Sequence, residues 1–430
     1  MRRRTLAKVL ACLSLLPARA RAQPVGSRSI TVTGVSSFRY AEALLPAFTA
    51  RTGIAVQLQV LPYPQLRQNS LADLVGGTAK SDVYTQDIIW LGEWASRGYA
   101  RPLDDLVARD AAELQFDDFL PGAVEATSRW NGKLWSLPFG AYYFLNFFRE
   151  DLFREAGLAP PRTLDDVTAA AARLTNRGAN RAGIAMPYQR GGPITSWFLA
   201  TYAGAGGRLL ADPPSDFTPT LDTPLARQVL DSYLSWLASA PTGAINYHWN
   251  DQTVAMQTGR IAMAPSFSIN GTEFVKPDRS TVAGKVGFTT MPRATAAAAA
   301  RVPFGGWALS INPRTPRTEE AWTFLKYMTS TAVQVELAKL NGTPVRRSAM
   351  EDPELQAAYP WLPFILQAER EGLVVPDYRP RYPFYPEVEE ALGLELNRAA
   401  LKQVGAAEAL AAAQGKLIAL LKAAGHPVRA

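Results

Sequence analysis

The segment around Asp87 constrains the fold most strongly, because residues 76–106 predict a strand, a turn and a helix in direct succession. Residues 82–86 combine β-branched and aromatic side chains between turn-prone flanks, which is typical of a strand. Residues 88–97 place two tryptophans on one helical face, and Gly98 suits the helix end. Ligands of open α/β sheets bind outside the carboxyl ends of strands. Asp87 is therefore a candidate ligand acceptor, and the alternative is a helix cap.

The length and composition indicate a large globular protein. A chain of 430 residues exceeds what one hydrophobic core usually serves, so two lobes or domains are expected. With 47% hydrophobic and only 19% charged residues, the composition is unlike that of a disordered chain.

The N-terminal third alternates strands and helices. A strand at residues 29–33, a helix at 42–51 and a strand at 54–60 follow one another. This alternation predicts the α/β class, with a parallel sheet and crossover helices. Further expected elements are a hairpin at 131–137, a strand at 183–186, helices beginning at Thr163, near Ser196 and at Pro224, and helices at 387–403 and 406–424.

Residues 1–22 have the pattern of a cleaved signal peptide, with a basic start and a short apolar run. Ala20 and Ala22 form a small-residue cleavage site; we expect cleavage after Ala22, with Ala20 as the alternative. Arg3 and Arg4 also resemble a twin-arginine signal, so Sec and Tat export both stay open. The sequence thus predicts an exported, periplasmic protein.

The predicted leader changes the charge of the mature chain. It contains six basic residues and no acid, and removing them from the formal net charge of +7 leaves about +1. Nucleic-acid binding is therefore not expected. Cys12, the single cysteine, leaves with the leader, so no disulfide is expected.

The sequence contains few groups suited to catalysis or metal binding. It has two histidines, His248 and His426, the second near the C-terminus, where order is usually poor. Metal-ligand clusters, phosphate-binding glycine loops and the G-x-S-x-G nucleophile motif are missing from the sequence. We expect no cofactor and no metal, and we do not expect an enzyme.

Aromatic residues are abundant just after strand-like segments and at predicted helix starts. Trp197, Phe267, Trp307 and Tyr385 all stand at such positions. An aromatic face with a nearby polar acceptor suits a sugar, which has C–H faces and hydroxyl groups. Each aromatic alone is more often a core residue, so the joint pattern carries the prediction.

Five segments of the sequence resemble one known family. They are GGTAKSDVYTQDIIWLGEWASRGYARPLDDL, NGKLWSLPFGAYYFLNFFREDLF, MQTGRIAM, FGGWALSINPRTPRTEEAWTFLKYMTS and NGTPVRRS. Together they are similar to the extracellular solute-binding proteins of ABC importers, in particular the maltose/trehalose-type carbohydrate binders of family 1.

The resemblance implies a periplasmic-binding-protein-like fold of class II, with two α/β lobes joined by a three-segment hinge. The implied first lobe contains residues 23–138 plus 290–344, and the second contains 139–289 plus 345–430. The chain would pass between the lobes near Phe139, near Thr289 and near Pro344.

The resemblance also implies most of the ligand-binding residues. Some relatives carry a carboxylate where this chain has Tyr142, so the substrate cannot be transferred from any of them. Arg346 either reaches the cleft or pairs with a surface acid. The full expected set is Ser37, Phe38, Asp87, Tyr142, Trp197, Phe267, Gly306, Trp307, Arg346 and Tyr385.

The function implied is non-enzymatic capture of a sugar or polyol and its delivery to an ABC permease, by a protein expected to be a monomer. A secreted glycoside hydrolase is one alternative, but it needs two carboxylates and only Asp87 is a candidate. Ferric-ion binding, suggested by the tandem Tyr142 and Tyr143, is another.

Overall fold

The computed structural model describes residues 28–340 and 343–429, so the predicted signal peptide lies outside the described part. The strands are β1 (Ser29–Val35), β2 (Ala55–Leu61), β3 (Val83–Asp87), β4 (Arg129–Trp130), β5 (Lys133–Leu134), β6 (Leu137–Arg149), β7 (Leu210–Asp212), β8 (Asp216–Pro219), β9 (Met263–Phe267), β10 (Val286–Thr290), β11 (Val302–Ile311) and β12 (Val374–Val375).

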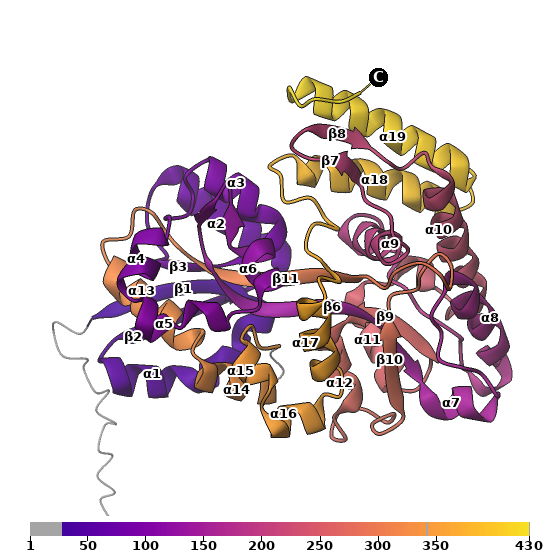
Figure 1. Ribbon diagram of the computed structural model, residues 1–430, viewed down its shortest axis with the longest axis horizontal. Helices are drawn as coiled ribbons and strands as arrows, with labels where there is room; N and C mark the ends of the chain where they lie inside the picture. Colours follow the sequence, from indigo (N-terminus) through magenta and orange to yellow (C-terminus); the bar gives the residue numbers. More distant parts are fainter. Residues whose placement is uncertain (1–27, 341–342, 430) are drawn as a thin grey trace, which may run out of the picture.

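Helices surround these strands on both sides (Figure 1). Their bounds are α1 (Leu45–Thr52), α2 (Tyr63–Gly76), α3 (Leu91–Ser96), α4 (Asp104–Arg109), α5 (Ala111–Leu114), α6 (Pro121–Thr127), α7 (Glu150–Glu155), α8 (Leu164–Leu174), α9 (Gly192–Gly204), α10 (Pro224–Ser235), α11 (Trp249–Gln257), α12 (Ser268–Val275), α13 (Thr318–Met328), α14 (Thr331–Lys339), α15 (Arg347–Met350), α16 (Pro353–Ala358), α17 (Leu362–Arg370), α18 (Tyr385–Ala400) and α19 (Ala406–Ala423).

One curled sheet runs through the molecule in the order β10-β6-β11-β3-β1-β2, with β12 on β11 and β9 on β6. β1 pairs in parallel with both β2 and β3, which confirms the β-α-β prediction for the N-terminal third. β11 is antiparallel to both β3 and β6. The fold is therefore α/β, as the sequence predicted.

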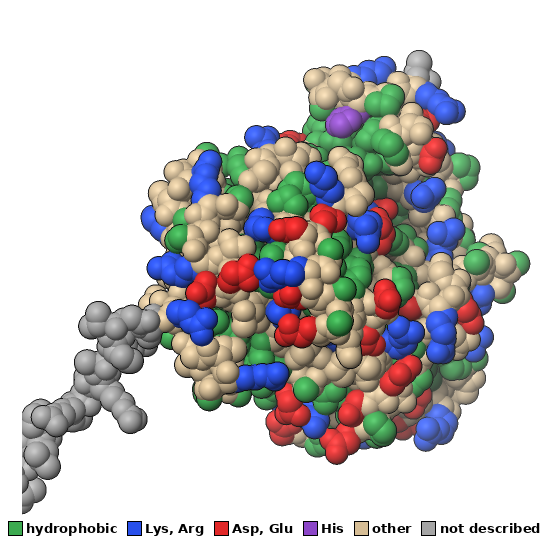
Figure 2. Space-filling model, turned by 60° about the vertical axis from the view of Figure 1, so that its left-hand side comes forward, with side chains coloured by type: hydrophobic (Ala, Val, Ile, Leu, Met, Phe, Trp, Pro, Cys, Tyr) green, Lys and Arg blue, Asp and Glu red, His purple; other side chains and the backbone are tan. Residues whose placement is uncertain are grey.

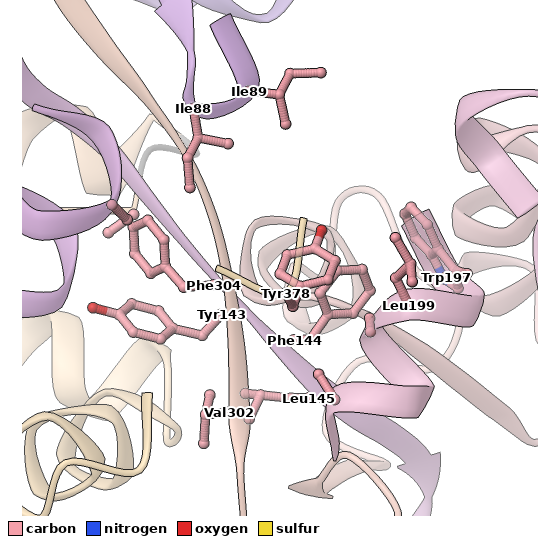
Figure 3. Close-up of a cluster of buried hydrophobic side chains, with 14 of the residues drawn as sticks. Ile88, Ile89, Tyr143, Phe144, Leu145, Trp197, Leu199, Val302, Phe304 and Tyr378 are labelled. Atoms are coloured by element: carbon pink, nitrogen blue, oxygen red, sulfur yellow. The ribbon is translucent and has the colours of Figure 1, made fainter. Parts of the chain in front are cut away.

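Strand β6 changes partners along its length. Residues up to Tyr143 pair with β11, whereas residues from Phe144 onward pair with β9. Figure 3 shows the two rings pointing to opposite sides of the strand: Tyr143 lies beside Phe304, and Phe144 lies beside Trp197 and Tyr378. Side chains on the two faces of β6 therefore pack into two different layers of helices.

These layers form two lobes (Figure 1). The first lobe contains β1–β3 with α1–α6, α13 and α14, and the second contains β9 and β10 with α7–α12, α18 and α19. The lobe boundaries derived from the sequence, 23–138 plus 290–344 and 139–289 plus 345–430, stay predictions.

Two local predictions had different outcomes. Thr163 caps α8 as expected, because its Oγ1 accepts from the Asp166 amide at 3.1 Å and Asp166 accepts in return from the Thr163 amide at 2.9 Å. The strand predicted at residues 183–186 is wrong. Its backbone bonds divide between Ser239 and Met263, so no continuous ladder forms.

The C-terminal residues are packed, contrary to the expectation for His426. The His426 ring lies 4.4 Å from the ring of Phe217 and 4.8 Å from that of Phe384. The Phe217 amide donates to the carbonyl of Pro427 at 2.7 Å. The C-terminal residues therefore pack against β8 and the start of α18.

Charges of both signs are mixed on the face drawn in Figure 2. None of the helices in the described residues combines the length and hydrophobicity that a bilayer crossing requires.

The Arg346 side chain is buried inside the first lobe, where it bonds to several backbone carbonyls. The side chain is 2% exposed, and it donates to the carbonyls of Leu114 at 2.7 Å and Gln115 at 3.0 Å. It also lies 3.5 Å from Asp118 and over the ring of Phe119. Of the two roles that the sequence left open, the structure supports pairing with an acid and not a place in the cleft.

We predict that Arg346→Met lowers the free energy of unfolding by about 3 kcal/mol, because it removes the donor to the buried carbonyls of Leu114 and Thr329 and the cation beside Asp118. Urea unfolding measures the change. The neighbouring Arg347→Met is the matched control, since Arg347 is exposed and donates to a single carbonyl. Equal stability of the two variants would contradict the assignment.

Candidate functional site

Asp87 ends β3 at the boundary between the lobes and is 5% exposed. Its Oδ1 accepts from the Ile89 amide at 3.4 Å, so it does cap the short 3-10 turn Ile88–Trp90. Its Oδ2 accepts from the Tyr63 hydroxyl at 2.9 Å. Capping therefore uses only part of the carboxylate.

A guanidinium from far along the chain reaches the same carboxylate. Arg379 Nη2 lies 3.7 Å from Asp87 Oδ1, and the Arg379 side chain is 11% exposed. Arg379 Nε is buried and has no hydrogen-bond partner among the described residues. A buried cation with unused donors indicates a place where a ligand supplies acceptors.

Aromatic rings of the first lobe surround Asp87. Trp307 on β11 is its cross-strand partner. The ring of Tyr63 stacks on Trp90 at 5.5 Å and meets Trp307 edge-on at 6.0 Å. Tyr63 also meets Trp249 of the second lobe at 6.2 Å, so the two lobes touch here.

The aromatic surface continues into the second lobe. Trp249 stacks on Trp197 at 6.3 Å, and Trp197 meets Phe267 at 5.4 Å. Phe267 lies 6.1 Å from Tyr142, which leads back to β6. A nearly continuous set of rings therefore lines the boundary between the lobes.

Helix α18 adds Tyr385 and Glu389. Burial raises the pKa of Asp87, and Arg379 opposes this rise. Burial likewise raises the pKa of Glu389, against Arg379 but with Asp87 adding to the rise. For Arg379, burial favours the neutral form, but Tyr378 and Asp87 outweigh it and raise the pKa. Arg379 thus lowers the pKa of both carboxyl groups, against the larger effect of their burial.

Several other donors at this boundary have no partner. Among the described residues, the indole Nε1 atoms of Trp90 and Trp249 and the hydroxyl of Tyr385 are buried without a hydrogen bond. Such atoms are normally few and costly in a folded protein. Because they lie near two carboxylates and Arg379, these atoms belong to the candidate site, where they could bond to a small molecule with both donors and acceptors.

The structure brings together six of the ten predicted site residues: Asp87, Tyr142, Trp197, Phe267, Trp307 and Tyr385. Phe38 lies instead in the core, 4.7 Å from Phe139, and Ser37 is exposed. Gly306 allows β11 and β6 to lie close together, because a Cβ there would lie 2.7 Å from the Gly140 carbonyl oxygen.

Sequence reasoning missed Tyr63, Trp249, Arg379 and Glu389 as site residues. Tyr63 and Trp249 begin α2 and α11, and an aromatic at a helix start was the same signal that identified Tyr385. No local pattern distinguishes Arg379 or Glu389 from other charged residues.

The tandem tyrosines do not form one site. Tyr143 donates to Glu369 Oε1 at 2.7 Å, whereas the hydroxyl of Tyr142 interacts with Tyr40. Within residues 28–340 and 343–429, no three His, Cys, Asp or Glu side chains come together as a metal site. The two tyrosines, whose tandem arrangement suggested ferric-ion binding, therefore contact different partners.

A separate cavity of about 250 Å³ lies near Tyr378. It is bordered by Trp130, Tyr202, Arg301 and Tyr382, and no residue of the predicted site lines it.

A family of bacterial extracellular solute-binding proteins matches residues 33–335 of this chain. A probable amino-acid ABC transporter periplasmic-binding protein of Sinorhizobium fredii is 26% identical over 449 residues, covering 99% of each chain. The mannitol-binding protein of Pseudomonas aeruginosa is 26% identical over 391 residues, covering 87% of this chain and 88% of its own.

Solved structures resemble the fold closely. A solute-binding protein from Agrobacterium radiobacter K84 in complex with ribitol is 30% identical, with a TM-score of 0.85 over 93% of this chain and 100% of that one. One from Agrobacterium vitis S4 with bound D-mannitol is 25% identical, with a TM-score of 0.81 over the same shares.

We predict a pH dependence for the folded protein without ligand. Because the folded pKa of Asp87 is raised, the native state binds its proton more readily than the unfolded state does. The free energy of unfolding should therefore rise as the pH falls from neutrality toward the ordinary carboxyl range, and rise less in Asp87→Asn.

Urea unfolding over a pH series measures this slope. Asp105→Asn is the control of opposite sign, because Arg101 holds the pKa of Asp105 below its usual value. The stability that Asp105 adds is lost only at lower pH, as the carboxylate takes up its proton. If the free energy of unfolding changed equally with pH in wild type and in Asp87→Asn above the ordinary carboxyl range, the raised pKa of Asp87 would be contradicted.

Proposed function

The chain belongs to the bacterial extracellular solute-binding protein family, and on that premise we propose that it captures a linear sugar alcohol between its lobes for an ABC importer. We place the mature protein in the periplasm as a monomer, delivering its ligand to the membrane subunits of a permease. The observation that carries the proposal is the group of unpartnered donors beside Asp87, Arg379 and Glu389.

The chemistry of a sugar alcohol fits this group. Each hydroxyl both donates and accepts, so it can donate to a carboxylate while accepting from Arg379 or an indole N–H. The C–H faces of the carbon chain can lie against Trp307 and Tyr63. The bound ribitol and D-mannitol of two solved relatives support the same class of ligand.

The transport step requires only closure. A ligand that contacts both lobes favours the closed form in proportion to its tighter binding there. β6 runs through both lobes and can bend where its partners change, between Tyr143 and Phe144. Asp87 and Trp307 would hold the ligand from one lobe, and Trp249 and Tyr385 from the other.

We propose that no chemical conversion takes place. Glu389 is a second carboxyl group near Asp87, which sequence reasoning did not find, so incubation of the protein with its ligand tests directly for turnover. Recovery of unchanged sugar alcohol after incubation is the expected result.

An amino acid is the second candidate ligand. One relative is named as a probable amino-acid binder. Arg379 could receive a carboxylate, and Asp87 or Glu389 an ammonium group. The ring-lined surface and the unpartnered indole donors favour a neutral polyhydroxy compound.

A thermal-shift panel tests these classes. We expect ribitol, D-mannitol or another linear sugar alcohol to raise the melting temperature, with about 2.7 kcal/mol of stabilisation at 100 times its dissociation constant. The panel should include cyclic sugars and the common amino acids. A response to amino acids alone would reverse the ranking of the two ligand classes.

We predict that Asp87→Ala and Trp307→Ala each weaken sugar-alcohol binding tenfold or more, on the order of 1.4 kcal/mol. The first variant removes a hydroxyl acceptor and the second a ring face. Isothermal titration calorimetry measures the loss. Trp135→Ala is the control, because the Trp135 indole donates to the Trp130 carbonyl of the β4–β5 hairpin and is not among the site residues. Wild-type affinity in both folded variants would remove the site assignment.

A further inference from the structure

The chain between α17 and α18, residues 371–384, forms a strap that rises between the two lobes (Figure 1). Near its start, β12 pairs with Val302 and Pro303 of β11. Farther along, the strap carries Arg379, the residue that reaches Asp87. What fixes the strap therefore also decides where Arg379 lies.

Before the strap begins, Glu369 caps helix α6 of the first lobe. Its Oε2 accepts from the Gly122 amide at 2.9 Å, and its Oε1 accepts from the Tyr143 hydroxyl at 2.7 Å. The first amides of a helix need outside acceptors, and the residue at the N-cap, Leu120, supplies no side-chain bond. Glu369 supplies one from almost 250 residues away in sequence.

At the other end of α6, Arg381 of the strap binds the last carbonyls. Its Nη1 donates to Glu125, and to Ala126 and Arg129 at 3.3 Å each. Its Nε donates to Asp377 at 2.7 Å, and the residue is 8% exposed. Both ends of one helix are thus held by residues that flank or belong to the strap.

A backbone contact fixes the strap to α3 as well. The Gly92 amide donates to the Arg381 carbonyl at 3.0 Å. A Cβ at position 92 would lie 2.1 Å from that oxygen, so only glycine permits this approach. Tyr382, the next strap residue, meets Trp130 of the first lobe at 5.1 Å and Phe217 of the second at 4.9 Å.

We propose that Glu369 and Arg381 are positioning residues that fasten the strap to both ends of α6 and so hold Arg379 beside Asp87 before ligand binds. The importance of Arg379 for binding rests on the proposed function. The strap also contacts the second lobe, since the Tyr378 hydroxyl lies 3.1 Å from Ser196 Oγ. Glu369 and Arg381 therefore fix the side of the strap that faces the first lobe, and Tyr378 and Tyr382 contact the second.

A double-mutant cycle tests whether Arg381 acts through Arg379. With D-mannitol and ribitol as probes, Arg381→Met should weaken binding about tenfold, as should Arg379→Met. The double variant should bind no more weakly than Arg379→Met alone, because the second change removes nothing further. Arg208→Met, an exposed arginine near the strap, is the control and should bind like wild type.

Wild-type affinity in Arg381→Met, or losses that add in the double variant, would overturn the proposal. A purely structural role for Arg381 would lower the melting temperature without changing affinity. Arg381→Lys keeps the charge but not the planar fork, and should recover part of the affinity.

Hydrogen exchange of the Gly92 amide tests the attachment without any ligand. We expect it to exchange at least tenfold faster in Arg381→Met, while the Asp82 amide, bonded to Thr31, keeps its wild-type rate. If Arg381→Met does not fold, Arg381→Lys gives the same readout. Unchanged Gly92 exchange overturns the proposal, whereas failure of wild type to bind either probe defeats only the proposed function.

Discussion

The architecture depends on one strand that two lobes share. β6 pairs with β11 up to Tyr143 and with β9 from Phe144, so it joins the strands of the two lobes into one sheet. Because side chains alternate along a strand, neighbouring rings enter different helical layers. Covalent continuity and hydrogen bonding thus bring Asp87 of one lobe and Trp249 of the other to the same boundary.

The boundary is costly in free energy. Asp87, Glu389 and Arg379 are largely removed from water, and paired charges recover such a cost only when their remaining bonds are made. Arg379 lies 3.7 Å from Asp87, beyond a good hydrogen bond, and its Nε is unused. A molecule that supplies several hydroxyls at once could complete these bonds, which is the reason for proposing a sugar alcohol as the ligand.

The sequence predicted much of the fold and part of the site. Parallel β1–β3, the Thr163 cap and the aromatic helix starts follow from local periodicity and turn chemistry, which short segments determine by themselves. Arg379 could not be predicted, because it stands two residues from Arg381 in the same strap, and only tertiary packing sends one to Asp87 and the other to α6. Residues 183–186 have the sequence of a strand, but their amides bond to two separate segments, so they have no single neighbouring strand with which to form a ladder.

The indoles around Asp87 have a practical consequence. Trp90, Trp249 and Trp307 all touch the ring of Tyr63, and two of them have unbonded N–H groups. Indole emission responds to the polarity and hydrogen bonding of its surroundings. A ligand bound as proposed would change the surroundings of these indoles, so titrations could be followed by their fluorescence without attaching a dye.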